Sequence, residues 1–233
     1  MKIVVINGTE VKGCTYHIKE MLLTNLRKDN EIVEFYLPKD APNFCCGCKL
    51  CFYESAAKCP HATSIGLIWT AIKESDLIIF AYPVYTLRAP GQVKSLLDHF
   101  GCHWMVHRPK KEMFNKRAII LTQSVGASNK AAQNDVATSL TWLGVSSIKK
   151  LGIRLNESII WEEISTKRKE KIEKKVKKLA KNHKIDKRVK PNLKVKLYFQ
   201  ISKMLHQRSI KKTKNELSVD DKHWIKNGWI NIK

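Results

Sequence analysis

Apolar runs alternate with amphipathic segments along the first 180 residues of the chain. Five short runs rich in β-branched residues predict β-strands, and they span residues 2–7, 31–37, 76–82, 117–123 and 146–154. In the other segments apolar residues recur at helical spacing, which predicts helices at residues 15–28, 64–75, 90–100, 129–144 and 167–184. This alternation of strand and helix is typical of an α/β domain.

Three of the predicted strands, at residues 2–7, 76–82 and 117–123, are apolar at nearly every position. Such strands are buried on both faces, so they predict a parallel sheet with helices on both sides. In an open parallel sheet the loops that follow the strands gather at the carboxyl edge, where ligands bind. We therefore expect a functional site built from the loops at residues 8–15, 38–60, 82–90 and 122–128.

The charge of the chain is uneven. Its 233 residues carry a net charge of +22, of which residues 1–148 hold +5 and residues 149–233 hold +17. In the helix predicted at residues 167–184, lysines surround apolar residues at helical spacing, which is typical of a helix with its charged face in water. We therefore expect no nucleic-acid partner. The change in composition predicts a domain of residues 1–184 and a basic amphipathic C-terminal extension of residues 185–233.

The extension contains an amphipathic segment at residues 193–212, with apolar residues on one face and lysines elsewhere. It predicts a helix that either packs on the domain or a second subunit, or lies on an anionic membrane surface. We favour packing because Trp224 and Trp229, further along the extension, are typical of contacts to protein.

Five of the seven cysteines lie within residues 45–59. Cys45, Cys48 and Cys51 form C-x2-C-x2-C, and Cys59 follows after seven residues, directly before a proline. Four thiolates are the usual ligands of a [4Fe–4S] cluster, and a Cys-Pro end occurs in bacterial ferredoxins. Zinc bound by the same thiolates, a dithiol exchange pair and ordinary buried cysteines remain open. Cys46 is not an expected ligand.

The sequence shows no secretory leader and no apolar run approaching the roughly 20 residues of a membrane span. We therefore expect the cytoplasm, where clustered cysteines are more often metal ligands or reactive thiols than disulfides.

Three histidines, His99, His103 and His107, recur at four-residue spacing, which would place them on one face of a helix. Gly101 interrupts this segment and no pair of carboxylates accompanies it. We therefore predict a surface or subunit-interface patch rather than a metal site, and a structural role for Cys102.

Two loops contain recognisable motifs. Residues 8–15 combine glycines, hydroxyls and a lysine before a helix, which suits either an anion site or an ordinary strand–helix turn. The third loop begins with Pro-Val-Tyr at residues 83–85, and P-x-Q-x-K-x3-D follows at residues 90–98. With these motifs, in this order and spacing over residues 1–180, the chain resembles the flavodoxin-like NAD(P)H-dependent FMN reductases and the related iron–sulfur flavoproteins.

This resemblance implies a flavodoxin-like three-layer sandwich with a five-stranded parallel sheet and FMN at its carboxyl edge. It implies three groups of contact residues, for the phosphate, the isoalloxazine ring and the far edge of that ring. These groups are, in turn, Thr9, Lys12, Gly13, Cys14 and Thr15; Pro83, Val84, Tyr85 and Thr86; and Ser124, Val125 and Gly126. Glu10-Val11 stands where the family usually has Pro-Arg, and Cys14 where Asn is common, so a carboxylate lies near the expected phosphate.

The function implied by the resemblance is FMN-dependent electron transfer. NAD(P)H or a ferredoxin-like donor would supply electrons, a quinone, small oxidant or redox protein would receive them, and the chain would form a homodimer. Two alternatives remain: a non-enzymatic electron carrier with FMN and a [4Fe–4S] cluster, and a scaffold whose basic extension tethers it to lipid or nucleic acid.

Overall fold

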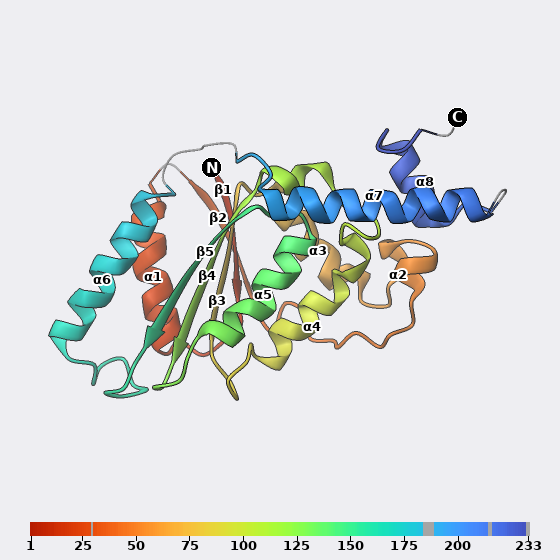
Figure 1. The fold of residues 1–233 in the computed structure, drawn as a ribbon. Coiled ribbons are helices and arrows are strands. Elements are labelled where there is room, and N and C mark those ends of the chain that lie inside the picture. The colour runs from red at the N-terminus through yellow and green to blue at the C-terminus, as the bar shows by residue number, and fades with distance from the viewer. Residues whose placement is uncertain (29, 184–188, 214–215, 232–233) are drawn as a thin grey trace.

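Five parallel strands form the centre of the protein (Figure 1). The computed structural model describes residues 1–28, 30–183, 189–213 and 216–231. The strands are β1 (Lys2–Asn7), β2 (Glu31–Tyr36), β3 (Leu77–Pro83), β4 (Arg117–Ser124) and β5 (Ser147–Arg154). Their order in the sheet is β2-β1-β3-β4-β5, the doubly wound order of flavodoxin-like folds. The predicted five-stranded parallel α/β sandwich is confirmed.

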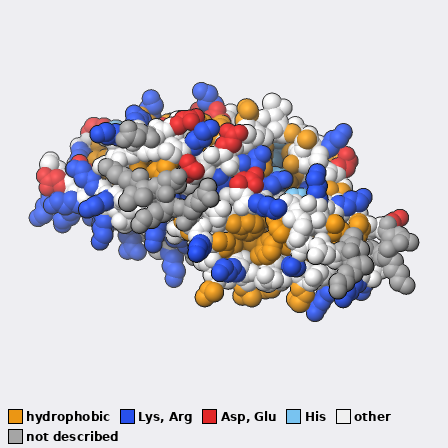
Figure 2. Space-filling view, turned by 90° about the horizontal axis from the view of Figure 1, so that it is seen from above, with side chains coloured by type: hydrophobic (Ala, Val, Ile, Leu, Met, Phe, Trp, Pro, Cys, Tyr) orange, Lys and Arg blue, Asp and Glu red, His pale blue; other side chains and the backbone are white. Residues whose placement is uncertain are grey.

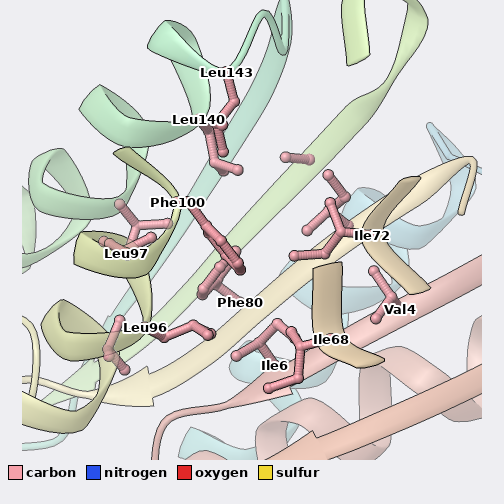
Figure 3. Close-up of a cluster of buried hydrophobic side chains, with 14 of the residues drawn as sticks. Val4, Ile6, Ile68, Ile72, Phe80, Leu96, Leu97, Phe100, Leu140 and Leu143 are labelled. Carbon is pink, nitrogen blue, oxygen red and sulfur yellow. The ribbon is translucent and has the colours of Figure 1, made fainter. Parts of the chain in front are cut away.

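Helices cover both faces of the sheet (Figure 1). On one side lie α1 (Cys14–Leu26) and α6 (Thr166–Lys181), and on the other lie α3 (Ala62–Glu74), α4 (Gly91–His99) and α5 (Lys130–Trp142). Because successive strand residues point to opposite faces, Ile3 and Val5 pack towards α1, whereas Val4 and Ile6 pack towards α3 and α4. Figure 3 shows the second of these two cores. Burial of both faces explains why the central strands are apolar throughout.

The cysteine-containing segment lies between β2 and α3 and has little regular structure. It contains one turn of helix, α2 (Leu50–Tyr53), and a 3₁₀ turn, η1 (Ala56–Lys58). Two further 3₁₀ turns, η2 (Gly101–His103) and η3 (Lys111–Asn115), connect α4 to β4.

Two C-terminal helices, α7 (Leu193–Thr213) and α8 (Val219–Lys226), lie on the side of α3, α4 and α5, near the end where the strands begin, with α7 against α5 and α8 against α2 (Figure 1). The ring of Tyr198 stacks on Trp142 with centroids 4.4 Å apart, and Phe199 contacts Phe114 and the fully buried Trp224. One face of α7 therefore packs on the first part of the chain. The boundary predicted near residue 185 lies outside the described residues. No helix within the described ranges is long and apolar enough to cross a bilayer.

Candidate functional site

The chain reverses its direction of travel through the sheet at β1, which pairs with β2 on one side and β3 on the other. The connections after β1 and β3 therefore pass over opposite faces and leave a crevice at the carboxyl edge, the position where open α/β sheets bind ligands. Residues 8–13 and 84–90, two of the loops expected at the site, flank this crevice.

Gly8, at the end of β1, fixes the first loop against the third. Its N–H donates to the carbonyl of Ala81 at 2.8 Å, and Gln92 Nε2 donates to its carbonyl at 2.8 Å. A Cβ atom at Gly8 would lie 2.5 Å from Tyr82 Cβ and 2.7 Å from Val93 Cγ2. Only glycine therefore allows this close approach of β1 to β3 and α4. Neither Gly8 nor Gln92 was among the predicted contact residues, although both lie in the motifs.

The N-terminus of α1 is open to an anion. The helix begins after Gly13, no side chain caps it, and its first turn contains no acidic residue. The amides of this turn have no intrahelical acceptor and lie at the positive end of the helix dipole. Lys12 is exposed beside them. Glu10 is engaged elsewhere, because its carboxylate accepts a hydrogen bond from the backbone N–H of Lys39 at 3.2 Å.

Two of the predicted phosphate contacts, Cys14 and Thr15, have buried side chains. Cys14 Sγ donates to the carbonyl of Ile159 at 3.1 Å, and burial raises the pKa of this thiol. Thr9 Oγ1 accepts from the N–H of Val11 at 3.2 Å, which shapes the loop. Cys14 and Thr15 can therefore contribute backbone amides to a phosphate site, whereas their side chains are used for packing.

A tight turn at residues 85–88 presents the third loop to solvent. Tyr85 and Arg88 exchange two backbone hydrogen bonds of 3.1 and 2.9 Å, and Thr86 and Leu87 between them have φ of 49° and 63°. Contacts from α5 stabilise this unfavourable backbone conformation: Asp135 pairs with Arg88 and accepts a hydrogen bond from the N–H of Ala89. The turn leaves the ring of Tyr85 47% exposed at the rim of the crevice, and Pro83 and Val84 half-buried behind it.

The fourth loop is shaped by Ser124. Its hydroxyl donates to the carbonyl of Ala127 at 2.7 Å and accepts from Asn129 Nδ2 at 2.9 Å, so this buried side chain is fully used within the loop. Val125 is exposed, and Gly126 has a φ of +74° that favours glycine. Of this predicted group, Val125 and Gly126 face solvent.

Exposed apolar side chains thus come from the three loops that follow β1, β3 and β4, at the edge of the sheet where the uncapped helix α1 begins. They are Val11, Tyr85, Leu87 and Val125. A ligand with a flat apolar ring and a phosphate matches this combination. The residues present therefore fit FMN.

The four cysteines predicted as metal ligands gather in one loop. Cys45 and Cys48 are exposed, whereas Cys51 and Cys59 are half-buried. Burial raises the pKa of Cys51, and the neighbouring thiols of Cys59, Cys45 and Cys48 raise it further. Gly47 and Lys49 have positive φ values of 68° and 63°, and the chain turns at these two residues within the loop.

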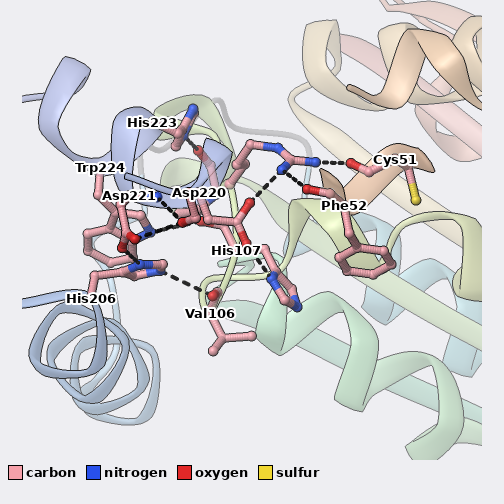
Figure 4. Close-up of polar contacts among 12 residues, drawn as sticks. Cys51, Phe52, Val106, His107, His206, Asp220, Asp221, His223 and Trp224 are labelled. Atoms are coloured by element: carbon pink, nitrogen blue, oxygen red, sulfur yellow. Dashed lines mark hydrogen bonds and ion pairs between the residues drawn. The ribbon is translucent and has the colours of Figure 1, made fainter. Parts of the chain in front are cut away.

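The loop is anchored to the domain by Arg108, which donates to the carbonyls of Cys51 and Phe52 (Figure 4). A cavity of about 420 Å³ lies beside Cys51 and Cys59. Thiolates on one zinc ion would all lie about 4 Å apart. Within the described part of the chain, no three of the four cysteine sulfurs come within 4.8 Å of one another. The four sulfurs are therefore not gathered around a single zinc-sized site in the described residues.

A histidine pair lies next to Cys59. His61 Nδ1 is 2.9 Å from His99 Nε2, and the other ring nitrogen of His99 donates to the carbonyl of Ser95 at 2.8 Å. Cys59, His61 and His99 offer ligand atoms within 4.8 Å of one another. Sequence reasoning missed His61, although its position two residues after Cys59 was visible.

The predicted surface patch of His99, His103 and His107 is wrong. His99 is buried on the inner face of α4, and His103 is buried at the end of the 3₁₀ turn η2, against Trp69. The ring of His103 stacks on Trp69 at 4.1 Å, and burial lowers its pKa to about 3. His107 Nδ1 pairs with Asp220 on α8 at 2.7 Å. Cys102 is buried, with its pKa raised to about 12 by burial, as a structural residue would be.

Comparisons with known proteins identify a family and a shared fold. The model of the family described as NADPH-dependent FMN reductase matches residues 1–156. An iron–sulfur flavoprotein of Archaeoglobus fulgidus is 26% identical over 102 residues, which is 44% of each chain. An FMN-dependent NADH:quinone oxidoreductase of Cereibacter sphaeroides is 40% identical over 40 residues, 17% of this chain and 20% of the relative. The matches thus span less than half the length of these curated relatives.

The fold is shared with solved structures. An FMN-dependent NADH-azoreductase from Bacillus anthracis, solved in complex with FMN, superposes with a TM-score of 0.61 at 12% sequence identity. The match covers 79% of this chain and 99% of the azoreductase.

Proposed function

The chain belongs to the NADPH-dependent FMN reductase family of oxidoreductases, and we propose that it transfers electrons from a reduced pyridine nucleotide through FMN to a quinone or another small oxidant. One observation supports this most directly: the uncapped N-terminus of α1 lies beside the exposed apolar residues of the third and fourth loops at the β1/β3 crevice. The name of the quinone oxidoreductase relative supports the choice of acceptor.

Each part of the crevice has a separate task in this proposal. The amides that follow Gly13, together with Lys12, hold the phosphate. Tyr85 and Leu87 flank the ring. The hydrogen-bonded turn at residues 85–88 is already ordered, so FMN binding loses little conformational entropy in this loop. FMN supplies the electron chemistry when bound. The protein positions it, excludes water from one face and leaves the other open to donor and acceptor in turn.

Replacing Lys12 by glutamate tests the phosphate site. Reversing a charge next to a dianion should weaken FMN binding about tenfold. Riboflavin has the same ring without the phosphate, so its affinity should change less than about twofold. Fluorescence titration of the apoprotein measures both, with Lys58→Glu on the exposed η1 turn as the matched control. Equal losses for both flavins would remove Lys12 from the phosphate site. A wild-type protein that binds neither flavin would favour the scaffold alternative.

A second candidate function is electron transfer through FMN and a [4Fe–4S] cluster, as the name of the Archaeoglobus relative suggests. The observation that favours it is the convergence of Cys45, Cys48, Cys51 and Cys59 on one anchored loop. These thiolates would hold the cluster and a ferredoxin-like protein would be the electron donor. Rapid exchange with such a protein, together with slow NADPH oxidation by the flavin-loaded chain, would favour this candidate over the first.

Replacing Cys48 by serine tests the ligand set. Anaerobically prepared wild-type protein should contain about four irons per chain, and Cys48→Ser less than about one. Cys46→Ser is the matched control, because Cys46 is equally exposed in the same loop and is not an expected ligand. Bound FMN should be unchanged in both variants. Iron-free wild-type protein, or equal iron in the two variants, would contradict the cluster.

Two further properties, the oligomeric state and the cellular location, are inferred from the resemblance and from the cysteines. We propose a homodimer, as the resemblance implies, and a cytoplasmic location, since none of the seven cysteines forms a disulfide and reducing compartments disfavour disulfides.

A further inference from the structure

One face of α7 is apolar and uncovered. Five side chains at positions spaced by three or four residues project from it, with exposed fractions between 39% and 84%: Leu193, Leu197, Ile201, Met204 and Leu205. Single exposed apolar residues are ordinary, but a continuous stripe on one helix marks an interaction surface.

The apolar stripe faces solvent because the opposite face of α7 is packed against the rest of the chain. Val195, Ser202 and His206 are buried against the rest of the chain. His206 Nδ1 lies 2.7 Å from Asp221 on α8, and Tyr198 stacks on Trp142. The helix therefore cannot rotate to bury the stripe in its own domain without breaking these contacts.

The charge around the stripe is positive. Within Leu193–Thr213 there are six basic residues and no acidic residue. The two acidic residues of adjacent α8 are engaged inward, Asp220 by Arg108 and His107, and Asp221 by His206 (Figure 4). Figure 2 looks down on this end of the molecule and shows hydrophobic side chains among Lys and Arg.

We propose that α7 docks on membranes that contain anionic phospholipids. A helix of 21 residues is about 31 Å long and can lie flat in the interface. Its aliphatic stripe would enter the region between headgroups and acyl chains, and its lysines would contact the anionic headgroups.

The same charges disfavour other occupants. A symmetric contact between two α7 helices would bring twelve basic side chains together, from two copies of six, without an acidic partner on either helix. Nucleic acid would satisfy the lysines but would leave the aliphatic stripe without a function. A lipid surface satisfies both features.

Sedimentation of the full chain with vesicles tests the proposal. Wild-type protein should pellet with mixed phosphatidylglycerol–phosphatidylcholine vesicles at low salt, and much less with pure phosphatidylcholine vesicles or at high salt. Leu197→Gln should weaken partition about tenfold, since it removes one inserted side chain. Leu67→Gln is the matched control, because Leu67 on α3 is 65% exposed and lies outside the stripe. Circular dichroism checks that both variants are folded.

Two results would overturn the proposal. The first is wild-type protein that stays in the supernatant with anionic vesicles at low salt. The second is equal vesicle binding by wild type and Leu197→Gln. If, in addition, Leu197→Gln converts a dimer to a monomer in size-exclusion chromatography, the stripe is a subunit interface instead.

Discussion

Replacing Gly8 by alanine is expected to lower the free energy of unfolding by about 2–3 kcal/mol, the upper part of the range of about 1–3 kcal/mol for overpacking. It should also weaken FMN binding at least about tenfold, because a site displaced by even part of an ångström loses preorganised contacts. The cause is the new Cβ, which would lie 2.5 Å from Tyr82 Cβ and force β1 away from β3. The carbonyl that accepts from Gln92 would move with it.

Urea unfolding and flavin titration measure the two effects. Gly66→Ala is the control, because Gly66 lies within α3 and a Cβ there would meet nothing within 4 Å. This change should leave FMN binding intact and raise stability by up to about 1 kcal/mol, as expected for a half-buried helical glycine with open space beside it. A Gly8→Ala protein with wild-type stability would show that the contact between the first loop and β3 is looser than described.

Replacing Asp221 by alanine is expected to lower the free energy of unfolding by about 3 kcal/mol at pH 7, because it leaves the buried donor His206 Nδ1, together with Ser218 Oγ, without an acceptor. Asp221 is 1% exposed and accepts from His206 Nδ1 at 2.7 Å and from Ser218 Oγ at 2.7 Å. Its own backbone N–H donates to Ser218 Oγ at 3.0 Å, the hydrogen bond that caps the start of α8. The loss should detach α8 from α7.

This effect should depend on pH. Burial alone would raise the pKa of Asp221, but hydrogen bonds from His206 and Ser218 hold it below its ordinary value of 3.8. A lowered folded-state pKa contributes stability above the ordinary value and loses it as the pH falls through the folded one. The difference between wild type and Asp221→Ala should therefore be constant near neutrality and shrink below about pH 4.

Urea unfolding over this pH range measures the difference. Asp98→Ala is the control: Asp98 pairs with Lys94 on the exposed face of α4, where a surface ion pair is worth less than about 1 kcal/mol. Equal costs for the two variants at pH 7 would contradict the importance assigned to the buried pair.

Much of the fold was predictable because the central strands are buried on both faces. Runs such as Ile3–Ile6 and Leu77–Ala81 are apolar at every position, and this pattern has few alternatives in a chain of this length. The cysteine segment follows β2 as expected, but Cys51 and Cys59 lie beside Cys102 and His99, at the C-terminal end of α4 rather than at the crevice. The placement of α7 and α8 was not predictable, because an amphipathic period shows that a helix has an apolar face without showing what covers it.

The site was less predictable at the level of side chains. Motif positions located the loops, but the side chains of Cys14 and Ser124 are used within the protein rather than towards a ligand. Gly8 matters through what lies across from it in space, which no local pattern reveals. His99 and His103 were misinterpreted for the same reason: four-residue spacing shows a shared face, whereas burial depends on the neighbours of that face.

The position of α7 has a consequence for the reaction partners. The helix lies against α5 near the level where the strands begin, whereas the crevice opens at their carboxyl end, so the two lie at opposite ends of the domain (Figure 1). A chain held on a bilayer by α7 would point its crevice into the bulk water, separated from the lipid by the length of a strand, about 20 Å. Such an orientation would select acceptors that diffuse in water over long-chain quinones that stay within the bilayer.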